Sequence, residues 1–194
     1  MKYYATLENG LSSKLKPKEL FVYAIMYIST DEDNMTDITI KQISQWSNIP
    51  VKTIEQSILP NLRKSLVFNV KPFCANGLKR NSYTFPKPYE NFRMIQKEFL
   101  LNRNLSPYQK GFMIALYMQA FNNTMLCGLT YAQIIFRLNF SNKTFYKYLN
   151  ELIELGNIVI INPNIPNFED LLDDLDIQEY DYINNSLYLK FSEK

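Results

Sequence analysis

The sequence predicts an α+β protein that is mostly helical, with small β ribbons, and that is built from two similar domains in tandem. Three observations support this class. Apolar residues recur at helical spacing, in the same order, in both halves of the 194-residue chain. Short segments typical of β-strands follow each set of helices. The two halves also match each other when the sequence is shifted by 91 residues.

The repeat runs without gaps from residues 21–70 to residues 112–161, with 8 identities in 50 positions. The identities are few, but the apolar pattern and the turn residues agree as well. The identical pairs at its centre are Thr39/Thr130, Gln42/Gln133, Ile43/Ile134, Asn48/Asn139, Lys52/Lys143 and Thr53/Thr144. We therefore expect two domains of one fold, residues 1–88 and 102–194, joined by a helical linker over residues 89–101.

Each copy is expected to contain three helices. They cover residues 17–29, 40–47 and 51–64 in the first copy and residues 106–121, 131–138 and 142–155 in the second. Thr39, Thr130 and Ser106 are suitable N-caps because a hydroxyl oxygen can accept a bond from a free N–H at a helix start. Gly156 suits a helix C-terminus. Pro60 should kink or restart the third helix of the first copy.

Short strands are expected after each third helix. They cover residues 66–70 and 81–85 in the first copy, with the strong turn signal Asn76-Gly77 between them, and residues 157–161 and 186–191 in the second.

In this order of elements the chain resembles the tandem winged-helix DNA-binding proteins, and in particular the replication initiators of plasmids and phages. The resemblance rests on Thr39-x-x-Gln42-Ile43 to Lys52-Thr53, and on Leu129-Thr130-x-x-Gln133-Ile134 to Lys143-Thr144 and on to Gly156. It covers most of residues 15–191. It implies two winged helix-turn-helix domains that bind double-stranded DNA, in replication initiation or transcriptional regulation of a plasmid, phage or other mobile element.

The candidate DNA-binding residues lie on the third helices and on the first ribbon. A winged helix places its third helix in the major groove, where cations meet phosphates and Thr, Asn or Gln can bond base edges. The helix candidates are Lys52, Thr53, Gln56, Arg63 and Lys64 in the first copy, and Asn142, Lys143, Thr144 and Lys147 in the second. The ribbon candidates are Lys71, Lys79 and Arg80. Solvated surfaces without a ligand are the alternative for each group.

An acidic ribbon, residues 163–185, departs from the family pattern, which has a short basic wing at this place. It carries seven acidic and no basic side chains. Its residues 168–175 have the spacing of an amphipathic helix. We expect the leucines of this helix to pack on their own domain with the acids outward. The alternatives are a solvated wing insertion without a ligand, a mask over the second reading helix and a contact for a protein partner. A protein-protein interaction module is therefore the rival function, and single-strand binding by exposed aromatics is a third.

The composition excludes several kinds of chemistry. The chain has no His, which removes His-dependent nucleophile pairs and His-ligated metals. Its two Cys are too few for a disulfide scaffold, and its five Gly are too widely spaced for a phosphate-binding loop. We expect no catalytic site, no cofactor and no metal. With no membrane-spanning run or signal peptide in the sequence, a cytoplasmic protein is expected. The net charge of +2 is uninformative, and a homodimer stays open.

Overall fold

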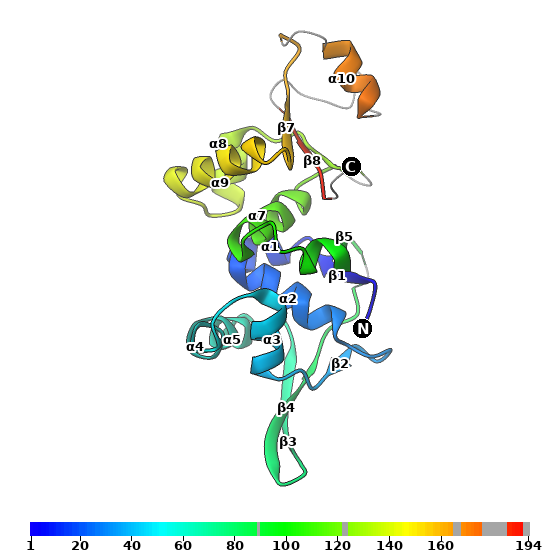
Figure 1. Cartoon of the computed structure of the whole chain (residues 1–194), viewed down its shortest axis with the longest axis vertical. Coiled ribbons are helices and arrows are strands. Elements are labelled where there is room, and N and C mark those ends of the chain that lie inside the picture. Colours follow the sequence, from blue (N-terminus) through cyan, green and yellow to red (C-terminus); the bar gives the residue numbers. More distant parts are fainter. Residues whose placement is uncertain (89, 122–123, 165–167, 176–185, 192–194) are drawn as a thin grey trace. The chain divides into compact units, whose positions relative to one another are not determined.

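The computed structural model describes residues 1–88, 90–121, 124–164, 168–175 and 186–191. It shows a mixed α/β protein whose sheets are small and antiparallel (Figure 1). The contacts divide the chain into two compact units, Met1–Met118 and Gln119–Lys194. Among the described residues no helix is long and apolar enough to cross a membrane.

The first unit contains helices and two small sheets. Its helical segments are α1 (Leu11–Lys14), α2 (Pro17–Ile28), α3 (Ile40–Ser47), α4 (Val51–Thr53), the π-helical η1 (Ile54–Ile58), α5 (Leu59–Lys64), α6 (Lys97–Leu101) and α7 (Pro107–Tyr117). Its strands are β1 (Tyr4–Glu8), β2 (Met35–Thr36), β3 (Asn69–Ala75), β4 (Leu78–Thr84) and β5 (Phe92–Gln96). The sheets have the orders β1-β5 and β2-β4-β3.

The core of the first unit is built around α2, in which every residue except Lys18 is buried. α7 packs directly on α2. A Cβ added to Gly111 in α7 would lie 1.9 Å from the main-chain oxygen of Pro17 in α2, so only glycine permits this approach. Arg93 also connects β5 to α7, because its Nε donates a hydrogen bond to the Tyr117 carbonyl at the end of α7.

The division into units differs from the boundary expected from the sequence, and the linker is not one helix. Residues 92–96 form strand β5, which pairs with β1, and only residues 97–101 are helical. The burial of β5 alternates: Arg93 and Ile95 are buried, whereas Phe92 and Met94 are exposed. This period of two is typical of a strand with one buried face. Since β5 pairs with β1 and α7 packs on α2, both belong to the first unit.

The third helix of the first copy continues through Pro60 by widening into a π-helix. Proline has no N–H to bond the carbonyl four residues earlier. The preceding Leu59 N–H bonds the Ile54 carbonyl, five residues back, as in a π-helix. The kink or restart expected at Pro60 is thus a change of helix type. A π segment holds one extra residue in the helix, and the repeat register changes accordingly. Ile54 and Phe145 are matched core residues 91 apart, but the buried Leu62 matches the buried Leu152, 90 apart, rather than Ile153.

The second unit repeats part of this plan. Its helices are α8 (Tyr131–Arg137), α9 (Asn142–Glu154) and α10 (Phe168–Asp174), and its strands are β6 (Leu126–Cys127), β7 (Ile158–Ile161) and β8 (Ser186–Leu189). The sheet order β6-β8-β7 corresponds to β2-β4-β3 in the first unit. The sequence interpretation did not include the two-residue strands β2 and β6, which are too short to show a pattern.

The expected N-caps and the expected C-terminal glycine are confirmed, but the helix expected over residues 106–121 ends at Tyr117. Thr39, Ser106 and Thr130 are N-caps, and each forms a capping box with the glutamine three residues later. Gly156 follows α9 with a φ of +72°, the left-handed conformation that ends many helices. In the first copy both ribbon strands are longer than expected and reach closer to the turn, at residues 69–75 and 78–84 instead of 66–70 and 81–85.

Candidate nucleic-acid interface

The candidates on α4, η1 and α5 form an exposed polar surface. Lys52, Gln56, Arg63 and Lys64 are exposed, whereas Thr53 is half-buried. The buried side chains Ile54, Ile58, Leu59 and Leu62 hold the opposite side of these segments in the core. The π segment lies between Lys52 and Arg63, so the direction of Arg63 does not follow from counting regular α-helical turns from Lys52.

The hairpin of β3 and β4 extends away from the helices of the first unit (Figure 1). Asn76 and Gly77 both have positive φ at its tip, as a tight two-residue hairpin turn requires. Cross-strand pairing sets Lys71 opposite Ser82 and Phe73 opposite Arg80, and sets Cys74 opposite Lys79. Because alternate residues of a strand face opposite sides, Lys71 and Arg80 share one face of the ribbon and Lys79 lies on the other. The three predicted cations therefore give the ribbon a basic character on both faces.

Arg80 is only partly available to a ligand. Its Nη1 lies 3.7 Å from Asp37 Oδ2, and both side chains are partly exposed. An exposed ion pair of this kind contributes little to stability, so phosphate could compete with the carboxylate. Lys71 and Lys79 are exposed, without an acidic partner among the described residues.

The first turn of α9 presents Asn142 and Lys143 to solvent. Thr144 is held differently. Its N–H donates to Ser141 Oγ at 3.1 Å, and its hydroxyl oxygen accepts a bond from Ser141 Oγ at 2.8 Å. The Thr144 side chain therefore belongs to the N-cap of the helix and is half-buried. Lys147 Nζ lies 3.9 Å from Glu151 Oε1, an exposed pair one helical turn apart.

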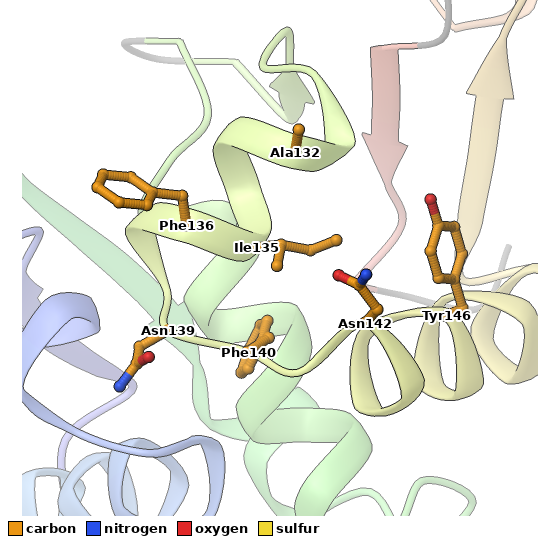
Figure 2. A pocket seen from close by; sticks show the side chains of 7 residues that line it. All are labelled: Ala132, Ile135, Phe136, Asn139, Phe140, Asn142 and Tyr146. Carbon is orange, nitrogen blue, oxygen red and sulfur yellow. The ribbon is translucent and has the colours of Figure 1, made fainter.

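A hollow of about 610 Å³ lies beside these residues, over the turn between α8 and α9. Figure 2 shows Phe136 and Ile135 on α8 and Tyr146 and Asn142 on α9 around it. Its lining consists of Ala132, Ile135, Phe136, Asn139, Phe140, Asn142 and Tyr146. Phe136 is 86% exposed and Tyr146 is 45% exposed, so these rings are not core residues. The sequence interpretation missed the hollow, because it assigned the aromatic residues mainly to the core. The available signal was the repeat, in which Phe136 stands at the position of Gln45.

The acidic helix α10 packs on its own unit, as expected. Leu172 and Leu175 form a buried cluster with Leu126 of β6 and Ile161 of β7, and Leu171 packs against it. The acidic side chains of the helix, Glu169, Asp170, Asp173 and Asp174, are exposed. The other acids of the ribbon, Asp176, Glu179 and Asp181, lie outside the described residues.

The two cysteines differ in accessibility. Cys74 is exposed on β3, and Cys127 is buried in β6. Burial raises the pKa of the Cys127 thiol to about 11, which keeps it in the unreactive protonated form at neutral pH.

Each unit thus presents its own exposed cations and amides, and the second unit also presents the exposed rings of Phe136 and Tyr146. Comparisons with family models, with curated proteins and with solved structures find no match to this chain.

Proposed function

We propose that the protein binds double-stranded DNA through two winged helix-turn-helix repeats. The recurrence of one order of elements carries the proposal. α2, α3 and α4–α5 with the sheet β2-β4-β3 correspond along the chain to α7, α8 and α9 with the sheet β6-β8-β7. The capped helices that begin after Thr39 and Thr130 are both followed by a left-handed asparagine, Asn48 directly after α3 and Asn139 two residues after the end of α8. This order of elements is the one that offers a third helix to the major groove.

The basic hairpin supports the same proposal. In a DNA groove, a two-stranded ribbon has a phosphate backbone on either side. Cations on both faces, Lys71 on one and Lys79 on the other, suit such a position better than a cation on one face only. The resemblance to replication initiators adds the biological role that we propose, replication initiation or transcriptional regulation of a mobile element.

Salt dependence of binding tests the proposal. Affinity of the full chain for random-sequence duplexes should be measured by fluorescence anisotropy from about 50 to 200 mM salt. Each phosphate contact contributes about 0.9 to the slope of log affinity against log salt. We expect the variant Lys71→Ala/Lys79→Ala to lose about two contacts' worth of slope, equally on all duplexes. The matched control Lys14→Ala/Arg103→Ala removes two exposed cations outside the hairpin and should keep the slope.

The exposed thiol of Cys74 gives an independent measurement. Because Cys127 is buried, a thiol reagent added to the native protein should modify Cys74 first. If the hairpin enters a groove, saturating duplex should slow the modification of Cys74. Unmeasurable affinity for every duplex at low salt would overturn DNA binding. An unchanged rate of Cys74 modification in the presence of saturating bound duplex would overturn the role of the hairpin.

A protein-interaction module is the second candidate function, and the acidic face of α10 favours it. This helix is fixed by its leucines and turns four carboxylates to solvent, which is an arrangement suited to a basic partner. Neutralising those carboxylates would weaken the binding of such a partner without weakening the binding of DNA.

A further inference from the structure

The hollow over the α8–α9 turn has a lining that differs sharply from its counterpart in the first copy. In the repeat register the seven lining positions correspond to Lys41, Ser44, Gln45, Asn48, Ile49, Val51 and Glu55. The first copy thus has charged residues where the hollow has Ala132 and Tyr146, and an amide where the hollow has Phe136. The uncharged lining with its two exposed rings is therefore not repeated at the matched sequence positions of the first copy.

None of the seven lining residues is charged. Phosphate contacts depend on cations, so the hollow itself is poorly suited to the DNA backbone. It is equally unsuited to a guanine edge, for which arginine or lysine is the usual partner. The polar groups in the lining that suit a base edge are the amides of Asn139 and Asn142, and Asn142 is the first residue of the reading helix α9.

An A·T pair presents the complementary chemistry in the major groove. Adenine offers N7 as acceptor and N6 as donor, which one asparagine amide can bond together. Thymine offers a C5-methyl group, which is favourable against apolar side chains and rings. The edge of a G·C pair has no methyl group and would set polar atoms against Phe136 and Ile135.

We propose that the second copy reads A·T pairs, with Asn142 bonding adenine and the apolar side chains of the hollow, Ile135 and Phe136 among them, contacting the methyl groups of thymine. This inference rests on the proposed DNA binding and assigns sequence preference to the second copy. The exposed cations Lys143 and Arg137, which flank Asn142 and Phe136, stay outside the lining and contact phosphates. The first copy, which lacks the apolar lining, does not contribute this preference.

Duplexes that differ by a methyl group test the inference. Affinity of the full chain is compared for an A·T duplex and for the same duplex with deoxyuridine in place of thymidine, and for a G·C duplex with cytosine or with 5-methylcytosine. Burying one methyl group is worth about four-fold in affinity. We expect the uridine duplex to bind about four-fold more weakly per contacted thymine, and 5-methylcytosine to bind more tightly than cytosine.

The variant Phe136→Gln/Tyr146→Gln should lose both methyl effects, while keeping its salt dependence. Both side chains are exposed, so the variant should fold, which circular dichroism and the Tm verify. Its matched control is Gln45→Ala at the corresponding place in the first copy, which should keep the methyl effects. A change in duplex shape on removing the methyl groups would affect wild type and variant alike, and so it cancels in their comparison.

Each contrary outcome has its own meaning. Equal binding of thymidine and uridine duplexes by the wild type overturns the A·T inference and leaves duplex binding standing. Tighter binding of single-stranded oligothymidine than of duplex, lost in the variant, also overturns it and makes the hollow a base-stacking pocket. Identical affinities of variant and wild type for every duplex overturn it in favour of an apolar protein partner. No binding of any duplex at low salt removes the proposed function itself.

Discussion

At the scale of single residues, left-handed turns are made mostly by asparagine. Among the described residues, Asn34, Asn48, Asn76, Asn91 and Asn139 have positive φ, and Leu66 is the remaining non-glycine residue that does. Asparagine tolerates this region better than other residues with a Cβ. Leu66 lies two residues after the end of α5 and is 87% exposed, so no packing compensates for its strained backbone. Gly156 takes the corresponding position after α9.

Replacing Leu66 by glycine should therefore stabilise the protein. We expect Leu66→Gly to raise the free energy of unfolding by about 1 kcal/mol, because glycine adopts positive φ without steric cost. Urea unfolding measures the change. Leu155→Gly is the matched control, since this exposed leucine ends α9 with right-handed φ and ψ and should lose stability on becoming glycine. Equal effects of the two substitutions would contradict the argument.

Lys110 is a buried cation that forms no ion pair with a carboxylate of the described residues. Its Nζ donates to the Leu100 carbonyl at 2.8 Å and lies 4.9 Å from the centre of the Phe21 ring. Burial lowers the pKa of Lys110 from 10.5 to about 8. Between these values the unfolded chain binds more protons than the folded one, so the free energy of unfolding should rise with pH. The rise due to Lys110 should approach about 3 kcal/mol by pH 10.5.

The variant Lys110→Met removes this titration. From pH 8 to pH 10 the free energy of unfolding of the wild type should rise relative to that of the variant. Urea unfolding at each pH measures this difference. Tyrosine ionisation in this range is common to both proteins and cancels. For the control Lys14→Met, which replaces an exposed lysine, the difference in free energy of unfolding from wild type should stay constant from pH 8 to pH 10. A constant difference between wild type and Lys110→Met would show that Lys110 titrates normally.

At the scale of elements, regular helices could be predicted and interrupted ones could not. Thr39 and Thr130 fixed the starts of α3 and α8 because a capping box depends on side chains close in the sequence. The π segment before Pro60 depends on how the core takes up one extra residue, which no local pattern encodes. Likewise, β5 was assigned to a helix because its partner β1 lies far away along the chain. Thr144 was predicted as a base reader, but a half-buried hydroxyl in a cap cannot be distinguished from an exposed one by sequence.

The acidic side chains and the leucines of α10 can be changed independently, because the acids are exposed and the leucines are packed. Neutralising the four exposed acids, as Glu169→Gln, Asp170→Asn, Asp173→Asn and Asp174→Asn, should leave the fold intact. If α10 masks the DNA-binding surface by its charge, DNA affinity should rise at least ten-fold, and less at high salt. Because the acids are exposed and the leucines are packed on the sheet, we expect a change smaller than two-fold, measured by anisotropy.

Leu172→Ala with Leu175→Ala serves as the counterpart of that variant. It keeps the charge and removes buried apolar groups, so it should lower the stability of the second unit by a few kcal/mol. Unchanged thermal unfolding would show that the leucines do not hold α10 in place.

The close approach of α7 to α2 is tested at one position. Alanine in place of glycine usually stabilises a helix interior by about 1 kcal/mol. At Gly111 the added methyl meets the Pro17 main chain, which cannot move out of the way as a side chain can. We therefore expect Gly111→Ala to destabilise the protein by several kcal/mol in urea unfolding, as overpacking does. Stabilisation by alanine would mean that the two helices are further apart.

At the scale of the whole molecule, the repeat predicted two bodies, but the compact units are divided at another place. α7 corresponds to α2 in the repeat, yet it packs on α2 and belongs to the first unit. A chain ending at Met118 should therefore unfold cooperatively in urea, whereas a chain ending at Leu101, without α7, should lose cooperativity and expose apolar surface. Calorimetry and dye binding measure both properties. Equal stability of the two shortened chains would place α7 outside the first unit.

α2 and α7 hold matched positions in the repeat, and they pack on each other within the first unit. In a two-fold homodimer the same surface of each subunit meets its copy. Duplication and fusion of the gene for such a subunit would turn that contact into one between matched helices of a single polypeptide. Each copy is then free to diverge, since the partner is always present at a fixed ratio. The polar Gln45 and the aromatic Phe136, at one position of the two copies, are the kind of difference that a dimer of identical subunits cannot hold.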